Sequence, residues 1–374
     1  MRRSTKLASV VAVATLTLAG CANDSKDADT DTTSASDDLN CDDASGDGPK
    51  VGLAYDVGGQ GDNSFNDAAA AGMAKAVSDL SATCKEGEAQ DGESEDARED
   101  RLQQLADAGY NPIIAVGFAY SDAVNAVAPD YPEASFAVVD GYDPDDKPND
   151  NVAYLGFAEN EGSFLVGVAA AEKTQTDHIG FVGGVHNDLI KKFEAGYTAG
   201  AEAVNPDITV DVKYIEESDL SGFADTAGGK AAAAGMYDNG ADIVYHAAGA
   251  SGSGVFDAAV DAGDGMWAIG VDSDQYLSAS DAQKPHILTS MLKRVDVATY
   301  NMIESIANDE PLTSYVVYDL AADGVGYSES NEQAIDGLTD GIDDYAEQIK
   351  SGDIDDYAAK IKSGEIKVPT VPAS

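Results

Sequence analysis

Short apolar runs alternate with helical patterns along almost the whole chain after residue 50. The first run, at 51–54, leads through a glycine-rich turn into an Ala-rich helix that begins at Asn66 or Asp67. Such alternation predicts parallel sheets with helices on both faces. Because 374 residues exceed what one core of this kind comfortably holds, we expect an α/β protein with two lobes.

Two series of strand–helix units follow one another. In the first series we expect strands at 51–54, 112–118, 135–139 and 152–157, with helices to about residue 80, around 102–108 and over 164–171. The second has expected strands at 178–183, 208–215, 242–246, 267–271, 287–290 and 314–320, and helices at 188–203, 225–237, 253–262 and 295–306. The acidic stretch 84–96 predicts a surface segment.

The first 20 residues predict a secretory signal. Three basic residues precede an apolar run at 7–18 that is too short to span a bilayer. The run ends as Leu-Ala-Gly-Cys, which resembles the lipobox of bacterial lipoproteins and would place a lipid on Cys21; an ordinary signal that happens to end in Cys is the alternative. Since no other run approaches the roughly 20 apolar residues of a spanning helix, we expect a lipid-anchored protein at the extracytoplasmic face of the cell membrane.

The region after the signal is polar and acidic. Residues 21–48 have almost nothing to bury, which predicts a disordered tether. The whole chain carries a formal net charge of −46, from 68 acidic and 22 basic residues. A surface this acidic argues against nucleic acids and anionic lipid headgroups as partners, but it leaves a neutral ligand in a cleft possible.

The chain has three cysteines. If Cys21 is lipidated, Cys41 and Cys84 remain as an even pair in an exported protein. A disulfide between them is the simplest interpretation. It would join the end of the tether to the region that follows the first helix.

Motifs of catalytic and cofactor chemistry are absent. The turn at 59–64 approaches G-x-G-x-x-G, but Ser64 stands in place of the third glycine. The chain has no Walker A motif and no nucleophile elbow, and its four histidines have no metal-ligand spacing. We therefore expect a binding protein that is not an enzyme and uses no cofactor or metal.

Seven segments carry a recognisable family pattern. They begin with Asp-Asn-Ser-Phe-Asn-Asp at 62–67 and continue, in order, at 156–162, 181–184, 190–197, 240–249, 270–275 and 289–294. This pattern resembles the basic membrane protein (BMP) family, the nucleoside-binding lipoproteins of ABC importers. Asn63 departs from it, since the family usually has Lys there. The resemblance implies a two-lobed, periplasmic-binding-protein-like (type I) fold whose chain crosses between the lobes three times and which closes around a nucleoside.

This fold implies domain boundaries. We expect a signal peptide at 1–20, a tether at 21–48, lobe 1 from 49–155 plus 287–312, and lobe 2 from 156–286 plus 313–374. The last segment contains a duplication, in which 342–353 is followed at once by the similar 354–365. The duplication predicts one extra short helix without chemistry of its own.

The resemblance also implies a set of ligand-binding residues. A nucleoside needs flat apolar walls for its base and hydrogen-bond partners for the base edge and the ribose. The implied walls are Phe65 and Phe223, the implied partners of the base are Asn66 and Asp140, and the implied contacts to the ribose are Gly249, Asp272 and Lys293. In this scheme Lys293 also balances the charge of Asp272.

Each of these residues has a structural alternative. Phe65 could be a hydrophobic staple before a helix, and Phe223 could simply pack in its loop. Asp140 could form an Asx turn, and the remaining residues could belong to turns or to the solvated surface. Phe193 and Tyr197 are also aromatic, but their i, i+4 spacing on a helix favours the core.

Together these features predict a monomeric, lipid-anchored receptor that binds nucleosides, purines in preference, and delivers them to an ABC permease. The alternative is a binding protein of the same fold for a sugar or another small polar metabolite, because sugars also stack on aromatic rings. A nucleoside hydrolase would need a cluster of metal-binding aspartates at a strand mouth, and no such cluster is found in the sequence.

Overall fold

The computed structural model describes residues 39–144 and 147–350. The expected signal peptide, Cys21 and the second copy of the duplication lie outside these residues. Within the described ranges, none of the helices combines the length and the apolar composition that a membrane span needs.

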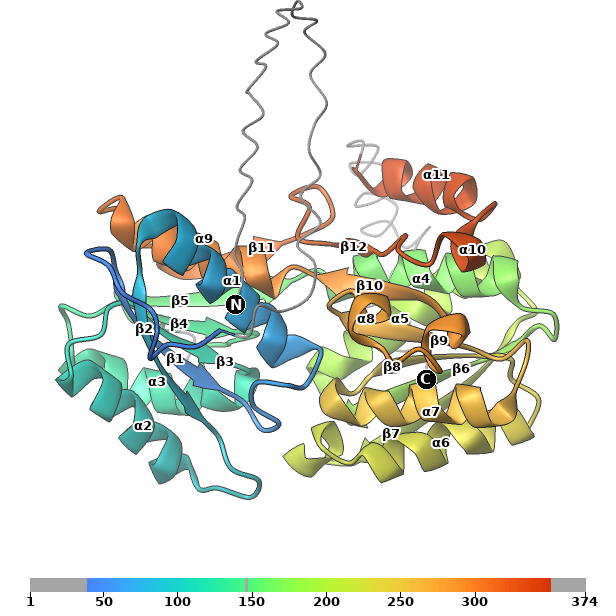
Figure 1. Cartoon of the computed structure of the whole chain (residues 1–374), viewed down its shortest axis with the longest axis horizontal. Coiled ribbons are helices and arrows are strands. Elements are labelled where there is room, and N and C mark those ends of the chain that lie inside the picture. Colours follow the sequence, from blue (N-terminus) through green and yellow to red (C-terminus); the bar gives the residue numbers. More distant parts are fainter. Residues whose placement is uncertain (1–38, 145–146, 351–374) are drawn as a thin grey trace, which may run out of the picture. The chain divides into compact units, whose positions relative to one another are not determined.

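The first sheet has six parallel strands in the order β11-β5-β4-β3-β1-β2 (Figure 1). Their bounds are β1 Lys50–Tyr55, β2 Thr83–Glu88, β3 Ile113–Val116, β4 Phe136–Val139, β5 Val152–Phe157 and β11 Ser314–Tyr318. The helices of this lobe form two pairs: α1 (Phe65–Leu80) packs with α9 (Val295–Ala307), and α2 (Glu95–Asp107) with α3 (Ser121–Val127).

The second sheet has the order β12-β10-β9-β8-β6-β7, with β12 antiparallel to β10 and the other neighbours parallel. Its strands are β6 His178–Val185, β7 Thr209–Glu216, β8 Ile243–Ala247, β9 Trp267–Asp272, β10 Ile287–Lys293 and β12 Val325–Tyr327. The longer helices of this lobe are α4 Glu159–Lys173, α5 Asp188–Val204, α6 Thr226–Asp238 and α7 Gly252–Ala262; α8 Gln275–Ser278, α10 Glu332–Ile335 and α11 Thr339–Lys350 complete it.

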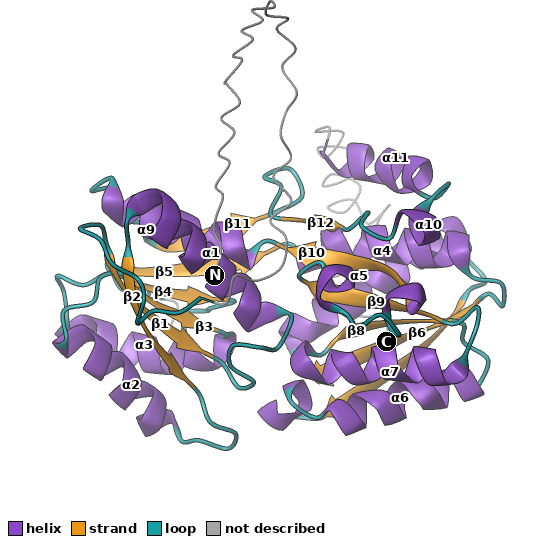
Figure 2. Cartoon of the chain, in the orientation of Figure 1, coloured by secondary structure: helices purple, strands orange, loops and turns teal. Residues whose placement is uncertain are grey.

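Helices cover both faces of each sheet (Figure 2). The central strands are therefore buried on both sides, and every residue of β3, β4 and β8 is buried. This is why their sequences are continuous apolar runs rather than alternating patterns. The observed α/β class is the one that the alternation of runs and helices predicts.

The chain passes between the two sheets three times, after β5, after β10 and after β11. Two strands nevertheless lie in the lobe opposite to the expected one. β10, placed with lobe 1 in the expected boundaries, belongs to the second sheet, and β11, placed with lobe 2, is the edge strand of the first. An apolar run fits either sheet equally well, so strand patterns alone do not reveal where the chain crosses.

The acidic stretch after α1 lies largely at the surface, as expected, but its first part is a strand that the sequence pattern did not reveal. Residues 83–88 form β2, an edge strand paired with β1 alone. Cys84 is buried in it, whereas Lys85 and Glu88 are exposed. Because an edge strand has one neighbour and tolerates charged side chains, its sequence lacks the apolar run that marks central strands.

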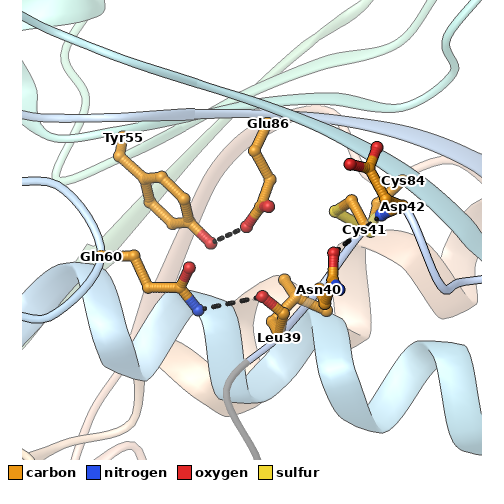
Figure 3. Close-up of a disulfide and its surroundings, with 8 residues drawn as sticks. All are labelled: Leu39, Asn40, Cys41, Asp42, Tyr55, Gln60, Cys84 and Glu86. Atoms are coloured by element: carbon orange, nitrogen blue, oxygen red, sulfur yellow. Dashed lines mark hydrogen bonds between the residues drawn. A yellow bond between two sulfur atoms is a disulfide. The ribbon is translucent and has the colours of Figure 1, made fainter.

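Residues 39–48 lie against lobe 1, so this part of the expected tether is wrong; residues 21–38 lie outside the described ranges. Cys41 and Cys84 form a disulfide, and Gln60 donates from Nε2 to the carbonyl of Leu39 at 3.3 Å (Figure 3). Further along, the Gly48 amide donates to the carbonyl of Ser81 at 3.0 Å. The N-terminal segment is thus fixed to β2 and to the end of α1.

We expect the Cys41–Cys84 bond in the mature protein. The two cysteines are 43 residues apart in sequence, so cross-linking them removes chain entropy from the unfolded state and stabilises the fold by about 4 kcal/mol. Peptide mass mapping without reductant should give one linked Cys41–Cys84 peptide, which separates into two after reduction. Two free thiols in the unreduced protein would contradict the pairing.

Candidate functional site

One cavity is lined by residues of both lobes. Its walls come from the carboxyl ends of β1, β3 and β4 in lobe 1 and of β8, β9 and β10 in lobe 2, together with the start of α1 and α5. It encloses an empty volume of about 590 Å³, its mouth included. The carboxyl edge of a parallel sheet is where α/β proteins bind ligands, because loops diverge there and leave room.

All seven residues implied by the family resemblance line this cavity: Phe65, Asn66, Asp140, Phe223, Gly249, Asp272 and Lys293. Sequence reasoning missed several others, namely Asp56, Val57, Asp62, Gly117, Phe118, Leu189, Ile190, Ala247, Ala248, Ala250 and Val271. Asp56 directly follows β1 and Phe118 lies just after β3, as Asp140 directly follows β4. Because each of these residues lies at or just after the end of a predicted parallel strand, its position in the sequence could have identified it as a candidate for the cavity wall.

Four phenylalanines contribute apolar surface to the cavity. Phe118 of lobe 1 meets Phe223 of lobe 2 edge to face, with ring centroids 6.4 Å apart. The Lys293 ammonium lies 5.0 Å from the ring centroid of Phe65 and 5.4 Å from that of Phe193. Phe193, expected in the core, is buried but also lines the cavity, because α5 starts at the cavity wall.

Tyr197, one helical turn after Phe193, is fully buried and packs on Tyr245, as its spacing predicts. The i, i+4 pattern therefore identifies a buried face of α5 correctly. It does not distinguish the end of that face that borders the cavity from the part inside the core.

The start of α1 is held by a carboxylate rather than by the residue at its N-cap. Asp62 accepts hydrogen bonds from the backbone amides of Ser64, Asn66 and Asp67 at 2.9, 2.9 and 3.1 Å. These are donors that a helix leaves unpaired at its first turn. Burial raises the pKa of Asp62 to about 7 despite these bonds.

Asn66 uses much of its hydrogen-bonding capacity inside the protein. Its Oδ1 accepts from the amide of Asp56 at 3.0 Å, and its Nδ2 donates to Asp62 at 3.0 Å. The residue is 2 % exposed. Asn66 thus connects the end of β1 to the start of α1 and borders the cavity.

Lys293 is the cation of the cavity wall. It is 2 % exposed, and its Nζ lies 2.6 Å from Oδ2 of Asp140 and 3.5 Å from Oε1 of Glu159. Lys192 reaches Glu159 from the other side at 3.1 Å. The charge of Lys293 acts on Asp272, as expected, and lowers the pKa of that carboxyl group. The direct ion pair of Lys293 is nevertheless with Asp140, which the sequence did not reveal.

The ion pair shifts the titration of both partners. Burial raises the pKa of Asp140 to about 6, although Lys293 opposes the shift. Burial disfavours the ammonium of Lys293, but the charges of Asp140, Glu159 and Asp272 outweigh it and raise the lysine pKa. Each member of the pair thus favours the ionised form of the other, and the pair joins the two lobes.

Asp272 lies at the end of β9 with a backbone φ of 64°, and Asp140 likewise follows β4 with a φ of 61°. Asp tolerates this left-handed region better than most residues. The Asp272 carboxylate accepts a hydrogen bond from Oγ of Ser64 at 2.7 Å, and burial raises its pKa. Both carboxylates thus leave their strands at the same kind of turn and border the same cavity.

The cavity wall is acidic overall. It contains Asp56, Asp62, Asp140 and Asp272 but one basic residue, Lys293. An anionic ligand would be repelled by such a wall, whereas a neutral donor of N–H and O–H groups would find acceptors. In the described residues no three His, Cys, Asp or Glu side chains are arranged to hold a metal ion.

Comparisons with a family model and with known proteins point to the same family. Residues 50–368 match the Bmp family, described as ABC transporter substrate-binding protein PnrA-like. A CD4+ T-cell-stimulating antigen of Listeria monocytogenes is 35% identical over 316 residues, which cover 81% of this chain and 86% of that protein. The ABC transporter nucleoside-binding protein BmpA of Lactococcus lactis is 38% identical over 235 residues, 60% of this chain and 65% of that protein.

Solved structures agree on the architecture. A solute-binding protein of an ABC transporter system from Aeropyrum pernix superposes with a TM-score of 0.69 at 26% identity, covering 86% of this chain and 99% of that one. A second, from Conexibacter woesei, has a TM-score of 0.64 at 22% identity with the same coverage. The two-lobed, periplasmic-binding-protein-like fold implied by the sequence is therefore confirmed.

Proposed function

Because the chain belongs to the Bmp family of PnrA-like ABC transporter substrate-binding proteins, we propose that it captures nucleosides, purines in preference, and delivers them to an ABC permease. We further propose that a lipid on Cys21 anchors it at the extracytoplasmic face of the cell membrane. The observation that carries the proposal is the combination, in one cavity, of aromatic rings with a carboxylate at each of two strand ends and a buried lysine.

The base would lie among the phenylalanine rings. Phe65 and Phe223 border the cavity from opposite lobes, and Phe118 extends the wall beside Phe223. Oδ1 of Asp140 is buried and has no hydrogen-bond partner within the described residues. A purine that carries N–H groups could donate a hydrogen bond to this oxygen. Without such a donor the oxygen is a buried acceptor whose lost hydration is not compensated.

The ribose would lie toward lobe 2. Asp272 is a carboxylate acceptor for sugar hydroxyls, and Lys293 is a donor beside it in the same wall. At Gly249 the backbone has a φ of 53°, and the residue has no side chain to keep the main chain away from a ligand. A neutral nucleoside therefore suits both the hydrogen-bonding groups and the negative charge of this wall.

Thermal-shift screening against nucleosides, free bases and sugars tests the proposal. Nucleosides should raise the midpoint of unfolding, because a ligand that binds the native state alone stabilises it. A response to sugars without a response to nucleosides would instead support the alternative ligand class. Chromatography after incubation with inosine should recover the nucleoside intact, whereas release of the free base would contradict a non-catalytic role.

Replacing Phe65 by alanine should weaken nucleoside binding at least tenfold, which corresponds to about 1.4 kcal/mol. The reason is the loss of base stacking, which contributes about 1–3 kcal/mol per base at comparable aromatic sites. Titration calorimetry measures the change. A Phe164→Ala variant, in the core of lobe 2 and outside the cavity wall, controls for lost packing, and unchanged affinity in Phe65→Ala would exclude stacking.

A further inference from the structure

Ser64 occupies a helix N-cap but does not cap the helix. A serine at this position normally accepts a hydrogen bond from an amide of the first turn. Here its side chain makes no such bond, because Asp62 already accepts from the amides of Asn66 and Asp67. The hydroxyl of Ser64, which is fully buried, instead donates across to the other lobe, where Oδ2 of Asp272 accepts at 2.7 Å.

Two further hydrogen bonds between the lobes hold this contact in place. Oγ of Ser273 donates to the carbonyl of Ser64 at 3.0 Å, and Nε2 of Gln275 donates to the carbonyl of Asn63 at 3.0 Å. Gln275 is 3 % exposed, and its Oε1 accepts from the amide of Val271. The turn before α1 is therefore fixed to the end of β9 by side chains that follow Val271.

The Asp272 carboxylate depends on Ser64 for its orientation. In the described residues its side-chain hydrogen bond comes from Ser64, whereas the nearby Lys293 pairs directly with Asp140. Burial raises the pKa of Asp272, and the bond from Ser64 counteracts that shift. A hydroxyl–carboxylate bond in a buried site is stronger than one between neutral groups, so this donor favours both one rotamer and the ionised form.

We propose that Ser64 is a positioning residue, which orients the Asp272 carboxylate from the opposite lobe and so prepares it to accept the sugar hydroxyls only when the lobes are closed. The inference rests on the proposed nucleoside function. Its consequence is that sugar recognition and lobe closure are coupled through one hydrogen bond. A free base closes the same lobes but has no sugar for Asp272 to hold, so it gains from that bond only the contribution to closure.

Calorimetric titration of matched variants with a purine nucleoside and with its free base tests this role. Ser64→Ala should weaken nucleoside binding roughly tenfold more than it weakens free-base binding. Ser64→Thr, which keeps the hydroxyl, should restore the nucleoside affinity. Ser273→Ala removes an interlobe hydroxyl bond that does not touch Asp272, so it should affect nucleoside and base equally.

Three results would overturn the inference. Equal losses for both ligands in Ser64→Ala would make Ser64 a general closure contact, and tighter nucleoside binding would mean that its hydroxyl competes with the sugar. A wild-type protein that binds no nucleoside would remove the proposed function, and this inference with it. Ser64→Cys, which keeps the side-chain size but is a weak donor, should repeat the Ser64→Ala result should the alanine variant not fold.

Discussion

Replacing Lys293 by methionine is expected to lower the free energy of unfolding by about 3–5 kcal/mol at pH 7. Removal of one partner of a buried ion pair leaves the other charge buried without compensation, and this is the range that such a loss typically costs. In this protein the residue left behind is Asp140, whose carboxylate lies 2.6 Å from the lysine. Urea denaturation at pH 7 measures the difference, provided that the slopes of the transitions agree.

A matched control lies on the other side of Glu159. Lys192 contacts that carboxylate at 3.1 Å, but its side chain is 33 % exposed, against 2 % for Lys293. Solvent screening weakens exposed pairs to about 0–1 kcal/mol, so Lys192→Met should cost much less. Equal losses in the two variants would show that burial of the ammonium is not what makes Lys293 important.

The deficit of Lys293→Met should shrink as the pH falls from 7 towards 5. Asp140 has a pKa of about 6 in the folded protein against 3.8 for the unperturbed group, and Lys293 holds it down. Without the lysine the folded-state pKa rises further, so the folded variant binds a proton that the unfolded chain does not. Stability then increases with acidification over that window, and a deficit that grows instead would contradict the assignment.

The fold was largely predictable because its signal is local. Buried parallel strands such as β3 and β8 are short apolar runs, and the helices between them have their own periodicity. The assignment of β10 and β11 to the wrong lobes has a different cause. Which sheet a strand joins depends on long-range pairing, such as that of β11 with β5. The residues of the strand do not indicate which partner it pairs with.

The family resemblance named seven residues that line the cavity. The sequence was less informative about residues that reach the cavity only through the three-dimensional arrangement of strands and lobes. Asp56 and Phe118 border the cavity because β1 and β3 end at the same sheet edge as β4, a relation that follows from strand order. The pairing of Lys293 with Asp140 depends on how two lobes meet. No spacing within one segment encodes a contact between residues 153 positions apart.

Asp272→Ala is expected to weaken nucleoside binding by about 10- to 100-fold and free-base binding far less. A hydrogen bond to a charged group contributes about 1.5–3 kcal/mol, and Asp272 is the carboxylate that the proposed scheme assigns to the sugar. Alanine at a φ of 64° adds backbone strain. Asp272→Asn, which tolerates that conformation and keeps the shape, separates the loss of charge from the strain.

Affinity and stability should move independently in these variants. Burial raises the pKa of Asp272, so keeping this carboxylate ionised in the folded protein at neutral pH lowers the free energy of unfolding. The protein tolerates this loss of stability because the proposed ligand site needs the charged acceptor. We therefore expect Asp272→Asn to lose nucleoside affinity in calorimetry without a lower midpoint of thermal unfolding.

Asp274→Ala, in the same turn but outside the cavity wall, should leave both ligands' affinities within about twofold. Equal losses of affinity for nucleoside and free base in Asp272→Ala would contradict the proposed contact between this carboxylate and the ribose. A group that contacts only the ribose contributes nothing to the binding of a ligand without a ribose.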